Sequence, residues 1–262
     1  PDDKPEDNAY FNRDYCLKEL RWAREAEKPI VCLVRAEDKD NVDIFFEDAP
    51  DDLKYLRDHV ILYDRNDPEY QKIGIRKLLV ATGLRPEGFG SVPIVQNDTP
   101  PKSDGGSHWT IACDHADVKG AALVSTVARS MRQRGYVVHQ DEKKEEEEEE
   151  EEGGSSVQRS DALLVILTDN VFTDSICDKI RAARSRKIPV VCAVSAEDKT
   201  RIYALSQNAP DDLKNLANDA IFHLETDDED YLECGVTKIL RASGHVTRED
   251  VEDENVVVDV RL

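Results

Sequence analysis

The side chains that could do chemistry in this sequence are scattered along it. Asp114 and Asp169 each follow an apolar run, so two carboxylates could meet at the ends of neighbouring strands and form an acidic, phosphate-accepting pocket. Such a pocket also needs a lysine after the fifth strand, where this chain has His223 and Leu224. Aspartates at strand ends commonly cap loops by bonding to nearby backbone, and that interpretation is favoured here.

The cysteines, histidines and glycines form no metal or cofactor motif. The six cysteines include no CxxC pair and the six histidines show no zinc-ligand spacing. Cys32 and Cys192 lie in two apolar runs, which is typical of buried, reduced thiols. His59 and His223, near the last strands, suit a structural role, and Gly88-Phe89-Gly90 lacks the flanking strand and helix of a phosphate loop. We therefore predict no metal and no bound cofactor.

The charge excludes several classes of partner. The formal net charge is −21, from 35 basic and 56 acidic residues, with eight of the acidic ones in the run Glu145–Glu152. Nucleic acid and anionic membrane surfaces are therefore excluded as partners. The sequence shows no signal peptide and no apolar run near the about 18 residues that a membrane span needs. A soluble, cytoplasmic protein is predicted.

An imperfect internal repeat organises the chain. Residues 30–34 match 190–194, residues 36–39 match 196–199 and residues 49–54 match 209–214, all at an offset of 160 (190 − 30). The offset becomes 161 by the last helix, where Tyr70 matches Tyr231 and Gly83 matches Gly244. A repeat of this length indicates a duplicated domain, since solenoid units are far shorter.

The two copies differ in completeness. In the first, helix 12–28, strand 30–34, a helix from residue 48 or 49, strand 60–63 and helix 69–81 are predicted. The second adds strands 109–113, 136–139 and 162–167 and helix 118–134 before the repeated part. Five strands alternating with helices predict an α/β, flavodoxin-like five-stranded parallel sheet with helices on both faces.

These elements set the predicted domain boundaries. Residues 1–84 form the C-terminal half of one unit, and 85–106, rich in Pro, Gly, Ser and Asp, form a linker. Residues 107–245 form a complete domain with an acidic insert at 141–154, and 246–262 form an acidic tail in which 256–260 could add an edge strand. A half sheet exposes a strand edge and its core, so we expect the second unit, another chain or further sequence to cover it.

Residues 15–20, Tyr-Cys-Leu-Lys-Glu-Leu, followed by Pro-Ile-Val-Cys-Leu-Val at 29–34, resemble the Toll/interleukin-1 receptor (TIR) domain family. In that family an aromatic-Cys-Leu-x-Glu-Leu helix start follows the third strand and leads to an apolar fourth strand. The second unit has its apolar third strand at 162–167, Ser-Ile-Cys at 175–177 and Pro-Val-Val-Cys-Ala-Val at 189–194. The resemblance covers 107–244 and, within 1–84, the C-terminal half of a second copy.

The resemblance implies a candidate catalytic residue. Some TIR domains cleave NAD⁺ at the nicotinamide bond with the glutamate of that helix start, which is Glu19 here. A carboxylate can orient the ribose hydroxyls and stabilise an oxocarbenium-like centre as nicotinamide leaves. The alternative is a solvated helix glutamate that pairs with Lys18 or a neighbouring arginine. In the second unit, the matching residue is Lys179 when counted from Pro189 and Ile180 when counted from Cys177.

Two functions follow from the resemblance. The unit with the glutamate lacks the first strands of the nucleotide pocket, while the other unit replaces or lengthens a pocket loop with Glu145–Glu152, which would repel a pyrophosphate. A site that uses Glu19 across a unit–unit contact is conceivable. The favoured expectation is a signalling or scaffold protein that binds other TIR-like domains and self-associates. The alternative is an NAD⁺ nucleosidase using Glu19, with NAD⁺ as substrate.

Overall fold

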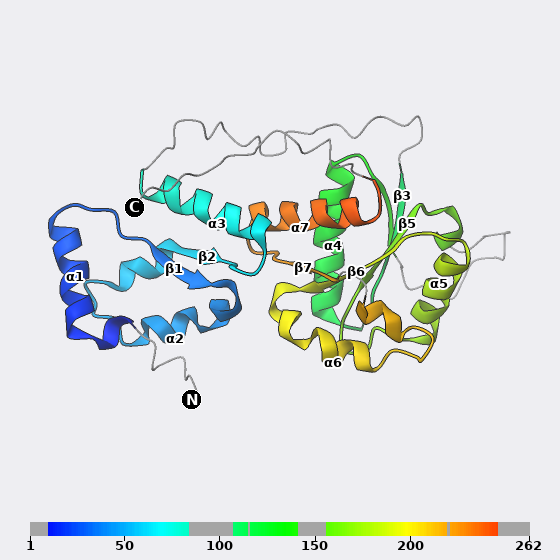
Figure 1. Cartoon of the computed structure of the whole chain (residues 1–262), viewed down its shortest axis with the longest axis horizontal. Helices are drawn as coiled ribbons and strands as arrows, with labels where there is room; N and C mark the ends of the chain where they lie inside the picture. Colours follow the sequence, from blue (N-terminus) through cyan, green and yellow to red (C-terminus); the bar gives the residue numbers. More distant parts are fainter. Residues whose placement is uncertain (1–9, 84–106, 115, 141–155, 219–220, 246–262) are drawn as a thin grey trace. The chain divides into compact units, whose positions relative to one another are not determined.

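The computed structural model describes residues 10–83, 107–114, 116–140, 156–218 and 221–245. The chain divides into two compact units, Pro1–Val92 and Pro93–Leu262 (Figure 1). This division falls inside the predicted linker 85–106. The linker, the Gly88-Phe89-Gly90 turn, the insert 141–154 and the tail 246–262 all lie outside the described residues.

The N-terminal unit contains two parallel strands. Its elements are α1 (Asp14–Glu25), β1 (Cys32–Arg35), α2 (Val42–Glu47), β2 (Val60–Tyr63) and α3 (Pro68–Ala81), with 3₁₀ helices at Tyr10–Asn12 (η2), Ala36–Asn41 (η3) and Lys54–His59 (η4). α3 begins where Asp67 accepts hydrogen bonds from the backbone of Glu69 and Tyr70, and Gly83, with φ of +71°, follows its end. A small core gathers Phe11, Phe46, Ala49, Leu53 and Leu56.

The C-terminal unit contains the complete sheet. Its strands are β3 (His108–Ala112), β4 (Val137–Gln140), β5 (Ala162–Ile166), β6 (Val190–Ser195) and β7 (Ile221–Leu224). They run parallel in the order β4-β3-β5-β6-β7, which is the flavodoxin-like order. The predicted α/β class with a five-stranded parallel sheet is confirmed.

Helices cover both faces of this sheet (Figure 1). α4 (Val118–Gln133) and α7 (Glu229–Ala242) contribute to one apolar core, and α5 (Asp174–Ser185) and α6 (Ile202–Gln207) contribute to the other. β5 is buried along its whole length because both of its faces lie under helices. None of the helices within the described ranges is long and apolar enough to cross a membrane.

Several predictions in the N-terminal unit were wrong in detail. The helix predicted at 12–28 is shorter, since α1 spans Asp14–Glu25. The helix predicted from residue 48 or 49 is absent there: α2 lies earlier, at Val42–Glu47, and turns lead into the 3₁₀ helix η4. β1 begins at Cys32, two residues later than predicted, whereas the matching β6 begins at Val190. Val190 pairs with Leu163 of β5, and among the described residues the matching Ile30 has no such neighbour strand. The strand therefore begins only where β2 supplies a partner.

Candidate functional site

Glu19 lies on the exposed side of α1 and is held by a phenol. The Tyr10 hydroxyl donates a hydrogen bond of 2.8 Å to Glu19 Oε2. This bond is the main cause of the raised pKa of Tyr10, with burial next, so the phenol stays protonated and remains a donor. The alternative interpretation, a solvated helix glutamate, agrees with this exposed position, but its partner among the described residues is Tyr10 and not Lys18 or an arginine. Both side chains are exposed to solvent.

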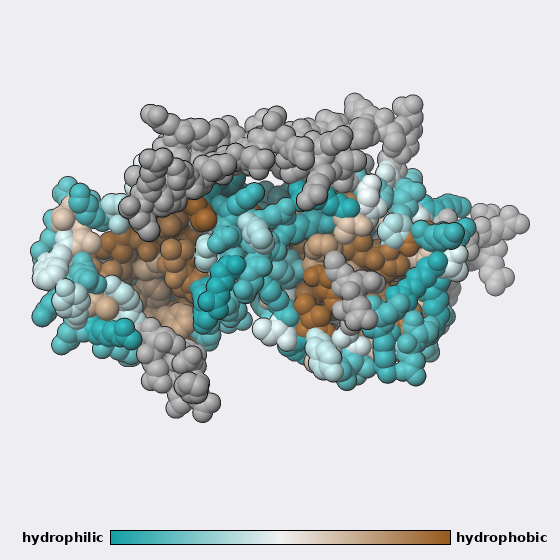
Figure 2. All heavy atoms as spheres, viewed as in Figure 1, coloured by the Kyte–Doolittle hydropathy of each residue, from teal (hydrophilic) through white to brown (hydrophobic). Residues whose placement is uncertain are grey.

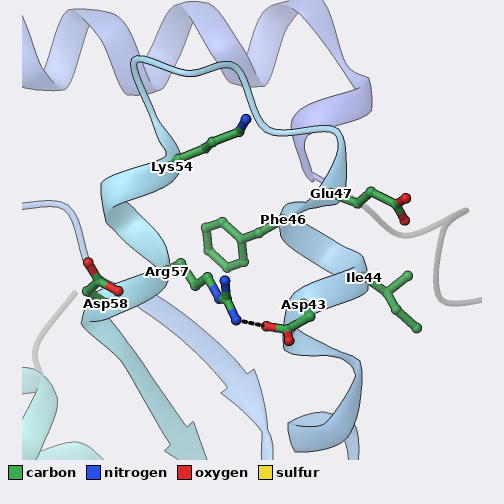
Figure 3. Close-up of a pocket in the computed structure, with 7 residues that line it drawn as sticks. All are labelled: Asp43, Ile44, Phe46, Glu47, Lys54, Arg57 and Asp58. Atoms are coloured by element: carbon green, nitrogen blue, oxygen red, sulfur yellow. Dashed lines mark ion pairs between the residues drawn. The ribbon is translucent and has the colours of Figure 1, made fainter.

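A hollow in the same unit lies away from Glu19. It has a volume of about 610 Å³ between α2 and η4, and its walls are formed by Asp43, Ile44, Phe46, Glu47, Lys54, Arg57 and Asp58. Figure 3 shows the Phe46 ring between the two helices and the ion pair that joins Arg57 to Asp43. Glu19 is not among these wall residues, so this hollow would not hold a sugar against the Glu19 carboxylate.

The charges of this hollow do not suit a pyrophosphate. Its walls carry three carboxylates, from Asp43, Glu47 and Asp58, against two cations. Both cations bind carboxylates already: Arg57 pairs with Asp43, and Lys54 donates to Asp51 over 2.7 Å. A nucleotide phosphate would have to displace these partners, which makes the hollow a poor site for NAD⁺.

The residue that matches Glu19 in the C-terminal unit is Lys179. Arg21 on α1 bonds to Asp52 through its Nε (3.2 Å), and Arg181 on α5 makes the same bond to Asp212 (2.7 Å). The two contacts lie 160 residues apart (181 − 21), so the helices match at that offset. Position 19 then corresponds to 179 (19 + 160). Ile180, the other predicted match, is fully buried.

The carboxyl ends of the strands in the C-terminal unit are occupied by local contacts. Asp114, after β3, accepts a hydrogen bond from the backbone of Ala116 over 2.9 Å, so its predicted role as a loop cap is confirmed. Asp169, after β5, pairs with Arg201 at 2.5 Å. Arg201 also contacts Asp198 at 2.6 Å. The two predicted carboxylates thus bind separate partners, and the described residues supply no acidic pocket built from both.

Burial makes several of the cysteine thiols poorly suited to catalysis. All six are free, and Cys113, Cys177 and Cys192 are buried. Burial raises the pKa of Cys32 and, as the largest cause, that of Cys177, so both stay protonated at neutral pH. A protonated thiol is neither a nucleophile nor a good metal ligand. Both Cys32 and Cys192 were predicted to be buried thiols: Cys192 in β6 is buried, whereas Cys32 in β1 is only half-buried.

Sequence reasoning missed two side-chain clusters in the C-terminal unit. Arg134, after α4, donates to the Glu233 carboxylate, the Glu233 carbonyl (2.9 Å) and Thr237 Oγ1 (2.9 Å) on α7. His108 on β3 and His139 on β4 bring their ring nitrogens within 3.3 Å. Each cluster joins residues far apart in the chain, so only the strand register and helix packing could have revealed it. His223, predicted as structural, lies half-buried in β7, and His59 packs edge-on to Tyr55.

Comparison with known proteins does not assign the chain to a family. The chain matches no protein-family model and no curated protein. Its function is therefore inferred from its own residues.

Proposed function

We propose that this chain is a cytoplasmic signalling or scaffold protein that binds other domains of the TIR-like α/β kind through the open side of its N-terminal unit. The open side comprises the edge of β1 that pairs with no described strand, with Leu33, and the apolar residues Ile75, Leu78 and Leu79 of α3. The observation that carries the proposal is that Leu33 is exposed and the three α3 residues are only half-buried, whereas their counterparts in the C-terminal unit are buried.

The strand edge supports the proposal first. β6 lies between β5 and β7, whereas among the described residues β1 has one neighbour, β2. Leu33 matches Ala193 (33 + 160), yet Leu33 is 49% exposed and Ala193 is 0% exposed. Figure 2 shows apolar side chains reaching the surface of the N-terminal unit over its two strands. An open edge with apolar neighbours is a template for another strand.

Helix α3 of the same unit, which packs on β2, supports the same conclusion. Ile239 and Leu240 of α7 are fully buried, and α7 packs with α4 in one core. Their counterparts at an offset of 161, Leu78 and Leu79 of α3, are only half-buried. Burying a fully exposed leucine is worth about 1.5–3 kcal/mol, and covering a half-buried one should gain roughly half of that. A partner that covers several of these side chains would still gain a substantial free energy.

The C-terminal unit indicates what such a partner would offer. There the counterpart of the open side is covered by β5, an apolar parallel strand, and by α4, an amphipathic helix. The partner would therefore present an apolar strand parallel to β1 and a helix that lies against α3. Within the described residues β5 of the C-terminal unit is paired on both edges, so the partner must supply a free strand edge, as the N-terminal unit of a second copy or of another such domain does.

The first test replaces Leu33 by lysine. A lysine on a strand edge opposes pairing with another strand, and Leu33 is exposed enough to tolerate it. We expect sedimentation velocity to show association of the wild-type chain that Leu33→Lys abolishes. Tyr203→Lys is the control, because Tyr203 is an exposed apolar residue on α6 of the other unit. Association of Leu33→Lys equal to that of the wild type, with unchanged circular dichroism, would refute this surface.

The same preparations discriminate the enzyme alternative. The proposal predicts no nicotinamide release from NAD⁺, because Glu19 lies on an exposed helix side and Lys179 replaces it in the other unit. Release by the wild type that disappears in Glu19→Gln would assign the NAD⁺ nucleosidase activity instead. Glu19→Gln keeps an acceptor for the Tyr10 hydroxyl, so the variant tests the carboxylate with little change to the helix.

A further inference from the structure

His108 and His139 face each other across two neighbouring strands. β3 pairs with β4 in the register His108↔Val137 and Thr110↔His139, which puts both histidines on one face of the sheet. His139 is exposed and His108 is half-buried. Val137 and His139 lie on β4, the edge strand of the sheet. The pair is therefore open to solvent between β3 and β4, at one edge of the sheet.

The geometry of the pair is edge to edge. His108 Nδ1 and His139 Nε2 are 3.3 Å apart, while the ring centroids are 5.6 Å apart and the planes differ by 7°. A centroid distance of 5.6 Å is close to the largest value possible for two imidazole rings whose nitrogens are 3.3 Å apart. The two nitrogens thus point at each other along the ring edges, and one N–H can occupy the space between them. Without a cation, one ring donates this hydrogen bond and the other accepts it.

This separation is also the one that a tetrahedral metal ion requires. Zn–N bonds of about 2.0–2.1 Å at tetrahedral angles hold two ligand nitrogens about 3.3–3.4 Å apart. The two ring nitrogens are thus already at a suitable spacing, and each ring must tilt so that its lone pair meets an ion placed beside the line that joins them. The exposed His139 ring has room for such a rotation.

Negative charge lies on the other side of His108. Asp161, opposite His108 at the start of β5, accepts a hydrogen bond from the His108 backbone through Oδ2 at 2.9 Å. Its own backbone donates to the His108 carbonyl over 2.7 Å. This exposed carboxylate favours a cation nearby. The described residues contain no group of three or more potential ligands, so water would complete the coordination shell.

We propose that His108 and His139 form a two-histidine site for a divalent transition-metal ion such as Zn²⁺, which clips the edge strand β4 to β3. The ion replaces the proton shared by the rings, since each nitrogen must present a lone pair to bind it. The spacing of histidines along the chain cannot indicate this site, because the two ligands lie 31 residues apart and meet only through the strand register.

The test measures Zn²⁺ binding by isothermal titration calorimetry in millimolar Ca²⁺. Calcium occupies carboxylate sites, including any on Glu145–Glu152, but competes poorly for imidazole. We expect one Zn²⁺ to bind the wild type. The affinity for Zn²⁺ should fall by at least about tenfold in both His108→Thr and His139→Thr, because each variant lacks one of the two ligands. Threonine suits a strand and offers no ring nitrogen. His59→Thr, which removes an exposed histidine of the other unit, is expected to bind like the wild type.

A second readout separates a metal site from a fold defect. Zn²⁺ is expected to raise the unfolding midpoint of the wild type and of His59→Thr, because an ion that binds only the folded state stabilises it. The midpoints of His108→Thr and His139→Thr, measured without metal, report the folding of each variant. Wild-type Zn²⁺ binding that survives in either variant, or its absence from a folded wild type, would overturn the proposal.

Discussion

Replacing Arg134 by methionine should destabilise the C-terminal unit more than the loss of a single polar side chain usually does. Arg134 follows α4, and its guanidinium binds the Glu233 carboxylate and carbonyl on α7. The Arg134 side chain is only 14% exposed and that of Glu233 is 31% exposed. Methionine keeps the volume of the aliphatic part of Arg134 but leaves Glu233 with the hydroxyl of Ser130, 2.7 Å away, as its described partner.

The burial of the pair sets the expected magnitude. Exposed ion pairs contribute about 0.2–1 kcal/mol, and breaking a fully buried pair costs about 3–5 kcal/mol. A pair of intermediate burial should fall between these limits, so we expect Arg134→Met to lower the free energy of unfolding by about 2–3 kcal/mol. Most of this cost comes from the carboxylate left without its partner, because a half-buried charge needs a counterion.

Tryptophan fluorescence can follow this unit alone. Trp22 lies exposed in the N-terminal unit and Trp109 is fully buried in the C-terminal one. In a Trp22→Phe background the emission therefore comes from Trp109, and urea titration reports unfolding of the unit that contains Arg134. Following one unit avoids treating a two-unit chain as a single two-state system.

The control and a rescue variant make the reasoning refutable. Arg181→Met removes a guanidinium that also binds carboxylates but is 44% exposed, and it should cost less than about 1 kcal/mol. Arg134→Met combined with Glu233→Leu removes both charges and should recover most of the loss. A loss for Arg134→Met no larger than that of Arg181→Met, or a double variant less stable than the single one, would refute the role given to this pair.

Two further perturbations follow from packing and from titration in the same unit. In Gly120→Ala the new Cβ would lie 2.8 Å from Thr168 Cγ2. Alanine has the better helix propensity, but because of this clash we expect the free energy of unfolding in urea to fall by about 1 kcal/mol. Adding Thr168→Ser removes the methyl group and should restore the stability. An equally stable Gly120→Ala would contradict this contact. Burial lowers the pKa of His245 below its ordinary 6.5, so the unfolded state takes up a proton first as the pH falls and stability drops below pH 6.5. His245→Phe should flatten that part of the stability–pH curve, and an unchanged curve would show that His245 does not contribute.

The sequence predicted the elements best where local signals and pairing agree. β2 (Val60–Tyr63) has the predicted bounds, and α3 starts one residue before its prediction, because Asp67 and Pro68 mark its beginning. β1 was misplaced because the start of a strand depends on its neighbour, and no local signal reports that neighbour's absence. The helix expected after residue 48 failed for another reason: Pro50 and the following aspartates also suit the turn found there.

The candidate site was less predictable than the fold. The helix motif identified Glu19, but its Tyr10 partner and its exposed position depend on how the chain before α1 folds back. The match between Glu19 and Lys179 required the Arg21–Asp52 and Arg181–Asp212 contacts, since counting from two different landmarks gave two answers. A pair such as His108 and His139 is fixed by strand register, which composition and spacing do not encode.

The salt dependence of self-association tests whether the open side or surface charge carries the contact. Copies with a net charge of −21 repel each other, while the residues proposed for the interface, such as Leu33 and Leu78, are apolar. Raising the ionic strength from 0.15 M to 1 M shortens the screening length from about 8 Å to about 3 Å, which weakens the repulsion and leaves apolar burial intact. Association measured by sedimentation should therefore strengthen with salt. Association that weakens as salt rises would mean that ion pairs hold the copies together, and the open side of the N-terminal unit would then not be the interface.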